Sequence, residues 1–271
     1  MPWTKLKNII LLILVMTNLF LLVFVLGQAW QNDRAREQTW ENALLFLRER
    51  GVQVEEALLP RTSDLLPQVA RRDLKGERAA AESLLQGTCE MESRGGEVYR
   101  YFNGNGSIQF HSDGTFSAQL DPAAFPLGED RAGGCLALLE QIGFQGELLE
   151  ERGDALTFGQ TWDGRRLFNL QVTVTAESGG ASGMTAGRRL VGEPEEDSAR
   201  QAIDPASALV ELFNGISALG DVCNQISALE QGYISGASLS GPMTLTPVWQ
   251  VTTDTGFYQL DLVTGGVSRL S

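Results

Sequence analysis

The chain has 271 residues, of which 43% are hydrophobic and 20% are charged. This length and composition allow a sizeable buried core and argue against a largely disordered chain. The 34 acidic and 21 basic residues give a net charge of -13, which argues against nucleic-acid binding, because phosphate recognition needs clustered lysine and arginine.

Residues 1–30 are predicted to form a cytoplasmic N-terminus and a transmembrane anchor. The run IILLILVMTNLFLLVFVL at 9–26 holds no charge, and as a helix it would measure about 27 Å, close to the thickness of a bilayer core. Lys5 and Lys7 precede the run, so the positive-inside rule places the N-terminus in the cytoplasm and the C-terminal domain outside. We therefore expect a single-pass protein of the cell membrane.

An alternative fate of this segment is removal as a signal peptide. Gly27-Gln28-Ala29 fits a small-x-small cleavage site, which would release the chain near Ala29. The apolar run is longer than the usual signal-peptide core, and this favours a retained anchor.

Thr17 and Asn18 are the polar residues inside the apolar run and are the candidate partner-binding residues. The amide of Asn18 either hydrogen-bonds to a partner helix in the membrane, a contact worth about 1 kcal/mol, or is tolerated there without a role.

The first predicted ectodomain unit covers residues 31–127. Trp40, Leu44, Leu45 and Leu47 lie on one stripe of a predicted helix that ends before Gly51. The turns NGNG and SDG permit positive φ angles and predict a meander of three strands. In chain order the unit comprises a helix at 31–50, a short strand at 51–54, a helix at 74–85 and strands at 97–102, 107–111 and 115–120.

The second unit covers residues 128–271 and repeats the order of helix followed by antiparallel strands. Its predicted elements are a helix at 134–142, a strand at 147–151, two long strands within 155–176, a helix at 205–219 and a hairpin within 246–266. The Gly-, Ser- and Ala-rich segment 177–190 is interpreted as a mobile hairpin tip, and EPEED at 193–197 as a linker or helix start within a linker near 191–204.

These elements predict an α+β fold, with a single N-terminal transmembrane helix followed by an ectodomain of two repeated helix-plus-antiparallel-sheet units. The last hairpin would close the sheet, and its Trp249, Val251 and Leu260 would fill a core and not a substrate pocket.

No constellation typical of catalysis occurs in the sequence. His111 is the sole histidine, and without a G-x-S-x-G elbow it is interpreted as a strand residue at or near the surface. Cys89, Cys135 and Cys223 lack C-x-x-C spacing. They form either one disulfide with a leftover thiol or buried free thiols, and the apolar helical positions expected for Cys135 and Cys223 favour free thiols. We therefore predict no enzyme activity, no catalytic, cofactor-binding or metal-binding residues, and no cofactor.

Several segments together resemble the YycI family of regulatory proteins. The matching segments, in chain order, are MPWTKLKNIILLILVMTNLFLL, LRERGVQV, ALTFGQTWDGRRLFN, ISALEQGYI and LTPVWQVTTDTGFYQLDLVTGGV. The last of them, with Asp261, Thr264 and Gly265 after a strand, also resembles a PepSY-type hairpin.

The resemblance implies a membrane-anchored, extracytoplasmic regulator in Gram-positive bacteria. It implies binding of the YycG/WalK sensor histidine kinase and a YycH-like protein, through the membrane helix and the ectodomain, so that two-component signalling adjusts cell-wall homeostasis. The alternatives are a PepSY-like inhibitor or secreted binding module that occupies an envelope protease by strand addition, and a wall-polymer hydrolase or binder.

Overall fold

The computed structural model describes residues 3–236 and 241–270, without the side chains of residues 3–6, 8–12, 23 and 26–33. The helices are α1 Trp3–Glu49, η1 Glu56–Leu58 (a 3₁₀ turn), α2 Leu74–Leu84, α3 Arg131–Glu140 and α4 Pro205–Ala218. The strands are β1 Gln53–Val54, β2 Gln68–Ala70, β3 Glu90–Ser93, β4 Tyr99–Asn103, β5 Gly106–Phe110, β6 Thr115–Leu120, β7 Gly146–Arg152, β8 Ala155–Trp162, β9 Arg165–Glu177, β10 Gly180–Arg188, β11 Pro194–Glu196, β12 Gln225–Gly236, β13 Met243–Thr253, β14 Phe257–Asp261 and β15 Val267–Leu270.

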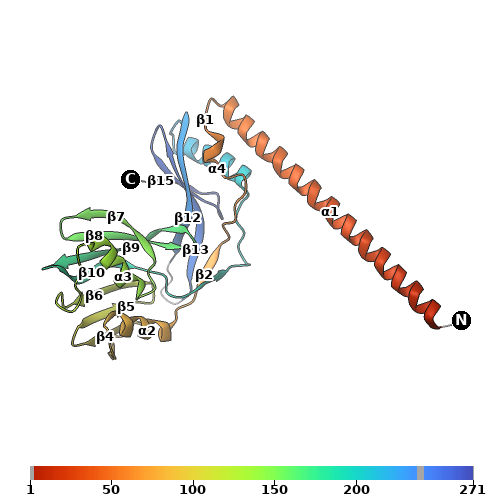
Figure 1. The fold of residues 1–271 in the computed structure, drawn as a ribbon. Helices are drawn as coiled ribbons and strands as arrows, with labels where there is room; N and C mark the ends of the chain where they lie inside the picture. The colour runs from red at the N-terminus through yellow and green to blue at the C-terminus, as the bar shows by residue number, and fades with distance from the viewer. Residues whose placement is uncertain (1–2, 237–240, 271) are drawn as a thin grey trace.

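All described strands belong to one mixed sheet (Figure 1). Its main path runs β11-β2-β13-β12-β9-β10-β6-β5-β4-β3, and β14-β15, β1 and β8-β7 branch from β13, β12 and β9. Most pairs are antiparallel, but β12 runs parallel to both β1 and β9. The parallel pairing of β12 with β9 joins the strands of the chain's C-terminal part to those of its middle.

The predicted fold class is wrong on two counts. Within residues 3–236 and 241–270, no helix combines the length and the apolarity needed to span a bilayer. In addition, the strands do not form two repeated units, because they join in a single 15-stranded sheet with parallel as well as antiparallel pairs. Long-range pairings cause this difference: β2 pairs with β13 through Ala70 and Met243, two positions that local turn patterns do not connect.

Among the described residues, the buried apolar side chains other than Val248 form two clusters. The central cluster has members between Ala81 and Met184, from α2, α3 and the strands β4, β5, β6, β8, β9 and β10. The terminal cluster has members between Trp40 and Ala70 and between Leu190 and Leu262, together with Leu167 and Leu170 of β9. The central cluster includes Leu127 and Cys135, on both sides of the predicted 127/128 boundary. The predicted domain limits themselves stay a prediction.

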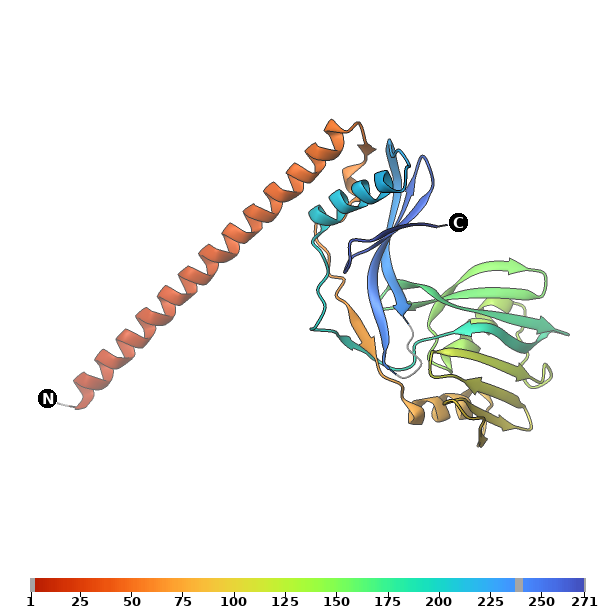
Figure 2. The same cartoon turned by 180° about the vertical axis from the view of Figure 1, so that it is seen from behind.

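Among the described side chains of helix α1, those that are buried against the domain lie in its last turns. Trp40, Leu44 and Leu47 are buried in the terminal cluster, and Phe46 packs edge-on against Phe213 of α4 with ring centroids 5.7 Å apart. Figure 2 shows α4 beside the end of α1, while the rest of α1 extends away from the domain. The helix ends where Gly51 adopts a φ of 81°, a conformation that glycine accepts without steric cost.

Many local elements agree with the sequence patterns. The helices predicted at 74–85, 134–142 and 205–219, the three-stranded meander, the hairpin around Asp163-Gly164 and the last hairpin are confirmed within a few residues. Asp204 shows why α4 begins where it does, because its carboxylate accepts hydrogen bonds from the backbone N–H groups of Ala206 and Ser207 at 3.1 Å.

Three local predictions are wrong. Segment 177–190, interpreted as a mobile tip, contains β10, which lies between β9 and β6. EPEED at 193–197 contains the strand β11 and not a helix start. Leu45 is 54% exposed, because the buried stripe of α1 uses Ala43 in its place.

Candidate functional site

The predicted partner-binding residues Thr17 and Asn18 lie on an exposed part of α1. Thr17 Oγ1 donates to the carbonyl oxygen of Ile13 at 2.8 Å, and Asn18 Nδ2 donates to that of Leu14 at 3.0 Å. Both side-chain donors are thus used within the helix, whereas the amide oxygen of Asn18 makes no hydrogen bond to a described residue. A role of these two residues in partner binding stays a prediction.

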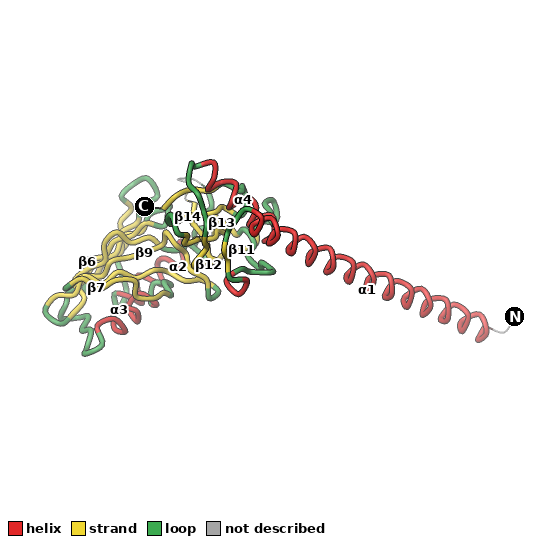
Figure 3. Tube along the Cα trace, turned by 90° about the horizontal axis from the view of Figure 1, so that it is seen from above, coloured by secondary structure: helices red, strands yellow, loops and turns green. Residues whose placement is uncertain are grey.

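The surroundings of Thr17 and Asn18 are apolar and open to solvent. We call residues 13–25 the apolar segment of α1. Its described large apolar side chains are each at least 51% exposed: Ile13, Leu14, Val15, Met16, Leu19, Phe20, Leu21, Leu22, Phe24 and Val25. Figures 1 and 3 show this part of α1 standing clear of the sheet. Scattered apolar residues are normal on a surface, but a contiguous set of this size marks an interaction site.

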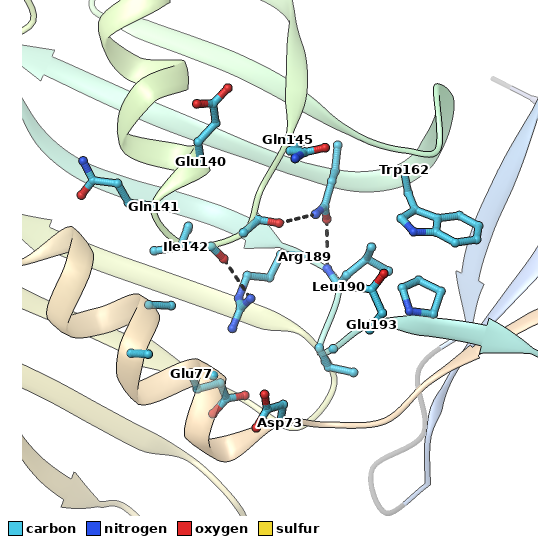
Figure 4. Close-up of a pocket in the computed structure, with 18 of the residues that line it drawn as sticks. Asp73, Glu77, Glu140, Gln141, Ile142, Gln145, Trp162, Arg189, Leu190 and Glu193 are labelled. Carbon is cyan, nitrogen blue, oxygen red and sulfur yellow. Dashed lines mark hydrogen bonds between the residues drawn. The ribbon is translucent and has the colours of Figure 1, made fainter.

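A cavity of about 1010 Å³ lies between the two core clusters (Figure 4). Its walls come from α2, the segment between α3 and β7, the end of β8, and the crossover 189–194 that leads from β10 to β11. Ile142 belongs to the central cluster, and Leu190 and Val191 belong to the terminal cluster. The cavity is therefore a junction between the two parts of the core.

Arg189 forms the floor of this cavity and is 8% exposed. Its Nη1 donates to the carbonyl oxygen of Ile142 at 3.0 Å, and its guanidinium lies 4.5 Å from the ring centroid of Phe110. Ile142 lies just beyond the C-terminal end of α3, where the chain turns at Gly143 with a φ of 73°. The negative end of the helix dipole thus faces the arginine.

Glu77 lies on the α2 wall of the cavity and is 2% exposed, but its carboxylate is engaged elsewhere. Arg72 donates to both of its oxygens, from Nε at 2.7 Å and from Nη2 at 2.9 Å. Arg72 also donates to the carbonyl oxygen of Glu97 at 2.6 Å and stacks on Tyr99. The negative charge of this paired carboxylate raises the pKa of Arg189 and so opposes the effect of burial.

Gln160 closes the opposite wall with two hydrogen bonds. Its Nε2 donates to the carbonyl oxygen of Gly143 at 3.1 Å, and its Oε1 accepts from the backbone N–H of Leu190 at 2.9 Å. Figure 4 marks the hydrogen bond between Arg189 and Ile142 with a dashed line. Because Gln160 is 2% exposed and both ends of its amide are used, it ties the loop after α3 to the β10–β11 crossover.

The charge of the cavity is uneven. Arg189 is the basic residue of its described lining, whereas the acidic lining residues are Asp73, Glu77, Glu140, Asp163 and Glu193. Burial lowers the pKa of Arg189 to about 10, and the nearby Glu77 carboxylate opposes that shift. Arg189 is therefore still a cation at neutral pH, at the base of a cavity with an acidic rim.

The remaining residues singled out in the sequence lie away from this cavity. Cys89, Cys135 and Cys223 are free and buried, as predicted, although Cys223 follows α4 and does not lie in it. Burial raises the pKa of the Cys135 and Cys223 thiols to about 11, so both stay protonated at neutral pH. His111 follows β5, and its Nε2 lies 2.9 Å from Gln109 Nε2. No three histidine, cysteine or acidic side chains gather as a possible metal site in the described residues.

Sequence reasoning missed the cavity and Arg189. Arg188 and Arg189 stand together after a segment interpreted as mobile, and nothing local distinguishes the half-buried arginine from the buried one. The alternation of buried and exposed residues along a strand does not identify Arg189 either, because the pairing register of β10 shifts between Met184 and Gly187.

No family model and no curated protein matches the chain. Among solved structures, the chain is similar to an uncharacterised protein from Eubacterium rectale ATCC 33656, with a TM-score of 0.39 and 13% identity over 81% of this chain and 90% of that one. It is also similar to the C-terminal domain of Bacillus megaterium YpeB, with a TM-score of 0.36 and 13% identity over 74% of this chain and 99% of that one. The resemblance to the YycI family accordingly stays a prediction.

Proposed function

We propose that the chain is a regulator that acts by binding other proteins, and that its partners are a sensor histidine kinase of the YycG/WalK type and a YycH-like protein. Contacts that differ between two states of the kinase would shift the balance between those states, and no catalytic step by this chain is needed. Action outside the cytoplasm and an effect on cell-wall homeostasis are parts of the same proposal. It does not depend on a membrane-spanning helix.

The observation that carries this proposal is the exposed apolar segment of α1. Covering one Leu or Phe side chain is worth about 1.5–3 kcal/mol, so a partner helix that covers several of these side chains gains a large free energy of association. The amide oxygen of Asn18, in the middle of the segment, provides an acceptor for a donor on that helix.

An affinity purification of the tagged full-length chain from mild-detergent extracts, followed by mass spectrometry, tests the proposal. The decisive variant carries Leu21→Glu and Phe24→Glu in the apolar segment. Its matched control carries Leu219→Glu and Val222→Glu, which change residues that are also exposed, at 49% and 65%, but lie elsewhere on the domain.

We expect the wild type and the control to recover a sensor histidine kinase together with a YycH-like protein, and the α1 variant to lose both. Recovery of the kinase by all three proteins would show that the apolar segment is not the contact. Absence of any kinase from the wild-type sample would overturn the proposal.

A second candidate function is inhibition of an envelope protease by strand addition, and the edge strand β3 favours it. β3 is the last strand of the main sheet path, all four of its residues are exposed, and Met91 is 53% exposed. An exposed edge offers unpaired backbone groups to an extended segment of another protein. Recovery of a protease by both the wild type and the α1 variant would support this function over the first.

A further inference from the structure

The cavity between the core clusters holds a cation that the described protein leaves only partly satisfied. A guanidinium carries five N–H donors, and one of those of Arg189 has a protein acceptor, the carbonyl oxygen of Ile142. No carboxylate of the described residues forms an ion pair with it, because the nearby Glu77 is held by Arg72 through both oxygens. A buried charge without a counter-charge is costly, so the remaining donors call for an anionic acceptor.

The shape of the site restricts that acceptor. Phe110 covers one face of the guanidinium at 4.5 Å, which leaves the edge of the planar fork for hydrogen bonds. A planar fork matches the two oxygens of a carboxylate, and such bidentate pairs are among the stronger hydrogen-bonded contacts. Gln160, another buried polar group of the wall, already has a hydrogen-bond partner at each end of its amide.

The rim adds a second requirement. Glu140, Asp163 and Glu193 are exposed residues of the lining, and their negative charge opposes the entry of a ligand that is purely anionic. A ligand that also carries an ammonium group satisfies both regions. Trp162 adds an aromatic side chain to the lining, and it packs edge-on against Tyr233 of the terminal cluster with ring centroids 5.7 Å apart.

From these contacts we infer that the cavity binds a free amino acid or a short peptide, with its C-terminal carboxylate on Arg189 and its ammonium group among the rim acids. A cavity of about 1010 Å³ has room for more than one residue. Because the walls come from both core clusters, the bound ligand would bridge them. The site is independent of the function proposed above and does not require any kinase contact.

Ligand binding to the full-length chain is tested by amide NMR spectra and thermal unfolding. The probes are a mixture of the standard free L-amino acids and a mixture of short synthetic peptides, each compared with its N-acetylated and its C-amidated counterpart. We expect saturable shifts with the free probes, and about tenfold weaker binding when either end is blocked.

The decisive variant is Arg189→Met, which keeps the length of the side chain and removes its charge. Its matched control is Arg188→Met, the neighbouring arginine, which lines a different hollow beside Phe116 and Phe168. We expect Arg189→Met to weaken binding by about 10- to 100-fold and the control to leave it unchanged. If Arg189→Met does not fold, Arg189→Lys keeps the charge and loses the fork, and should weaken binding by about tenfold.

Three results would overturn the inference. One is the absence of binding by either mixture. Another is binding that survives Arg189→Met or Arg189→Lys unchanged, which would leave Arg189 as a cap for the carbonyl end of α3. The last is equal affinity for the free and the N-acetylated probes, which would remove the role of the rim.

Discussion

The two core clusters belong to one sheet but are assembled differently. The central cluster comes from one continuous stretch of chain, in which neighbouring strands are joined by tight turns such as Asp163-Gly164, with φ angles of 49° and 69°. The terminal cluster joins distant parts of the chain, because β1 pairs with β12 through Gln53 and Gln225, and β2 pairs with β13. Closing such long loops costs conformational entropy, which must be offset by burial in the terminal cluster.

The comparison is tested most strongly by truncating one large side chain in each cluster. Trp249 of β13 and Phe158 of β8 are both 0% exposed. We expect Trp249→Ala and Phe158→Ala each to lower the free energy of unfolding by about 3–5 kcal/mol, through lost burial and a residual cavity. Urea unfolding followed by fluorescence and by circular dichroism measures both variants.

If the fluorescence and circular dichroism transitions of one variant occur at different urea concentrations, the two clusters do not unfold as one cooperative unit. A single shared transition in both variants would show that the sheet couples the clusters. Trp249→Phe is the control, because Trp249 Nε1 has no hydrogen-bond partner in the described structure and its loss should cost little beyond volume.

The next largest effect is expected at the ion pair on the cavity wall. Glu77→Gln removes the charge that Arg72, with a side chain 14% exposed, contacts through two nitrogens. We expect a loss of about 3 kcal/mol, because a mostly buried arginine is left without its partner. Chemical denaturation measures the loss, and Glu82→Gln, in an exposed pair with Arg78, should change stability by less than about 1 kcal/mol. Equal losses in the two variants would contradict this account.

Gly114 lies where the two core clusters meet, and its substitution tests how tightly they pack there. Gly114 has a φ of 84°, and a Cβ there would lie 2.5 Å from the carbonyl oxygen of Arg189 and 2.6 Å from Met243 Cε. Gly114→Ala should therefore cost more than Gly153→Ala, whose φ is 60° but whose Cβ would meet no atom within 4 Å. We expect about 1–2 kcal/mol for the open position from backbone strain alone, and a larger loss for Gly114. Similar melting temperatures for the two variants would show that the atoms around Gly114 move aside at little cost in stability.

The smallest effect is expected at the helix caps. Asp204 caps α4 beside the terminal cluster, and Asp130 caps α3 beside the central cluster, where its carboxylate accepts from Gly133 N–H at 2.9 Å. Replacing either by alanine should cost about 0.5–2 kcal/mol, measured by thermal unfolding. An unchanged Asp204→Ala variant would contradict a stabilising cap.

The Asp204 cap also predicts a pH dependence. Burial alone would raise the pKa of Asp204, but hydrogen bonds from Ser207 and Ala206 outweigh burial and lower it. The carboxylate thus stabilises the fold above the ordinary pKa of about 4, and this stabilisation is lost as the pH falls through the lowered pKa. Stability curves of the wild type and Asp204→Ala should converge in acid, and a constant gap between them would refute this linkage.

The sequence predicts the central region well because its signals are local. Asn-Gly and Asp-Gly turns indicate the hairpins. β10 is the exception: its Gly- and Ala-rich composition is typical of a loop, but small residues are required there because a Cβ at Gly187 would lie 2.7 Å from the Phe116 ring. β2, β3, β11, β12 and β15 were not predicted. Four of them are three or four residues long and owe their strand conformation to pairing with other strands, whereas β12 has 12 residues and was not assigned a structure.

The candidate site was not predictable for the same reason. Arg189, Glu77 and Gln160 are far apart in the chain, and their burial results from packing between the two clusters. By contrast, the apolar segment of α1 was evident in the sequence, although the transmembrane role assigned to it is not supported by the structure.

The attachment of α1 by its last turns has a mechanical consequence. The part of the helix between Trp3 and Trp40 is about 55 Å long at 1.5 Å per residue. A tilt of about 5° at the base, where Phe46 packs on Phe213, would displace the far end by about 5 Å. The helix is thus a lever arm, which converts a small rearrangement beside α4 into a displacement as large as one helical turn.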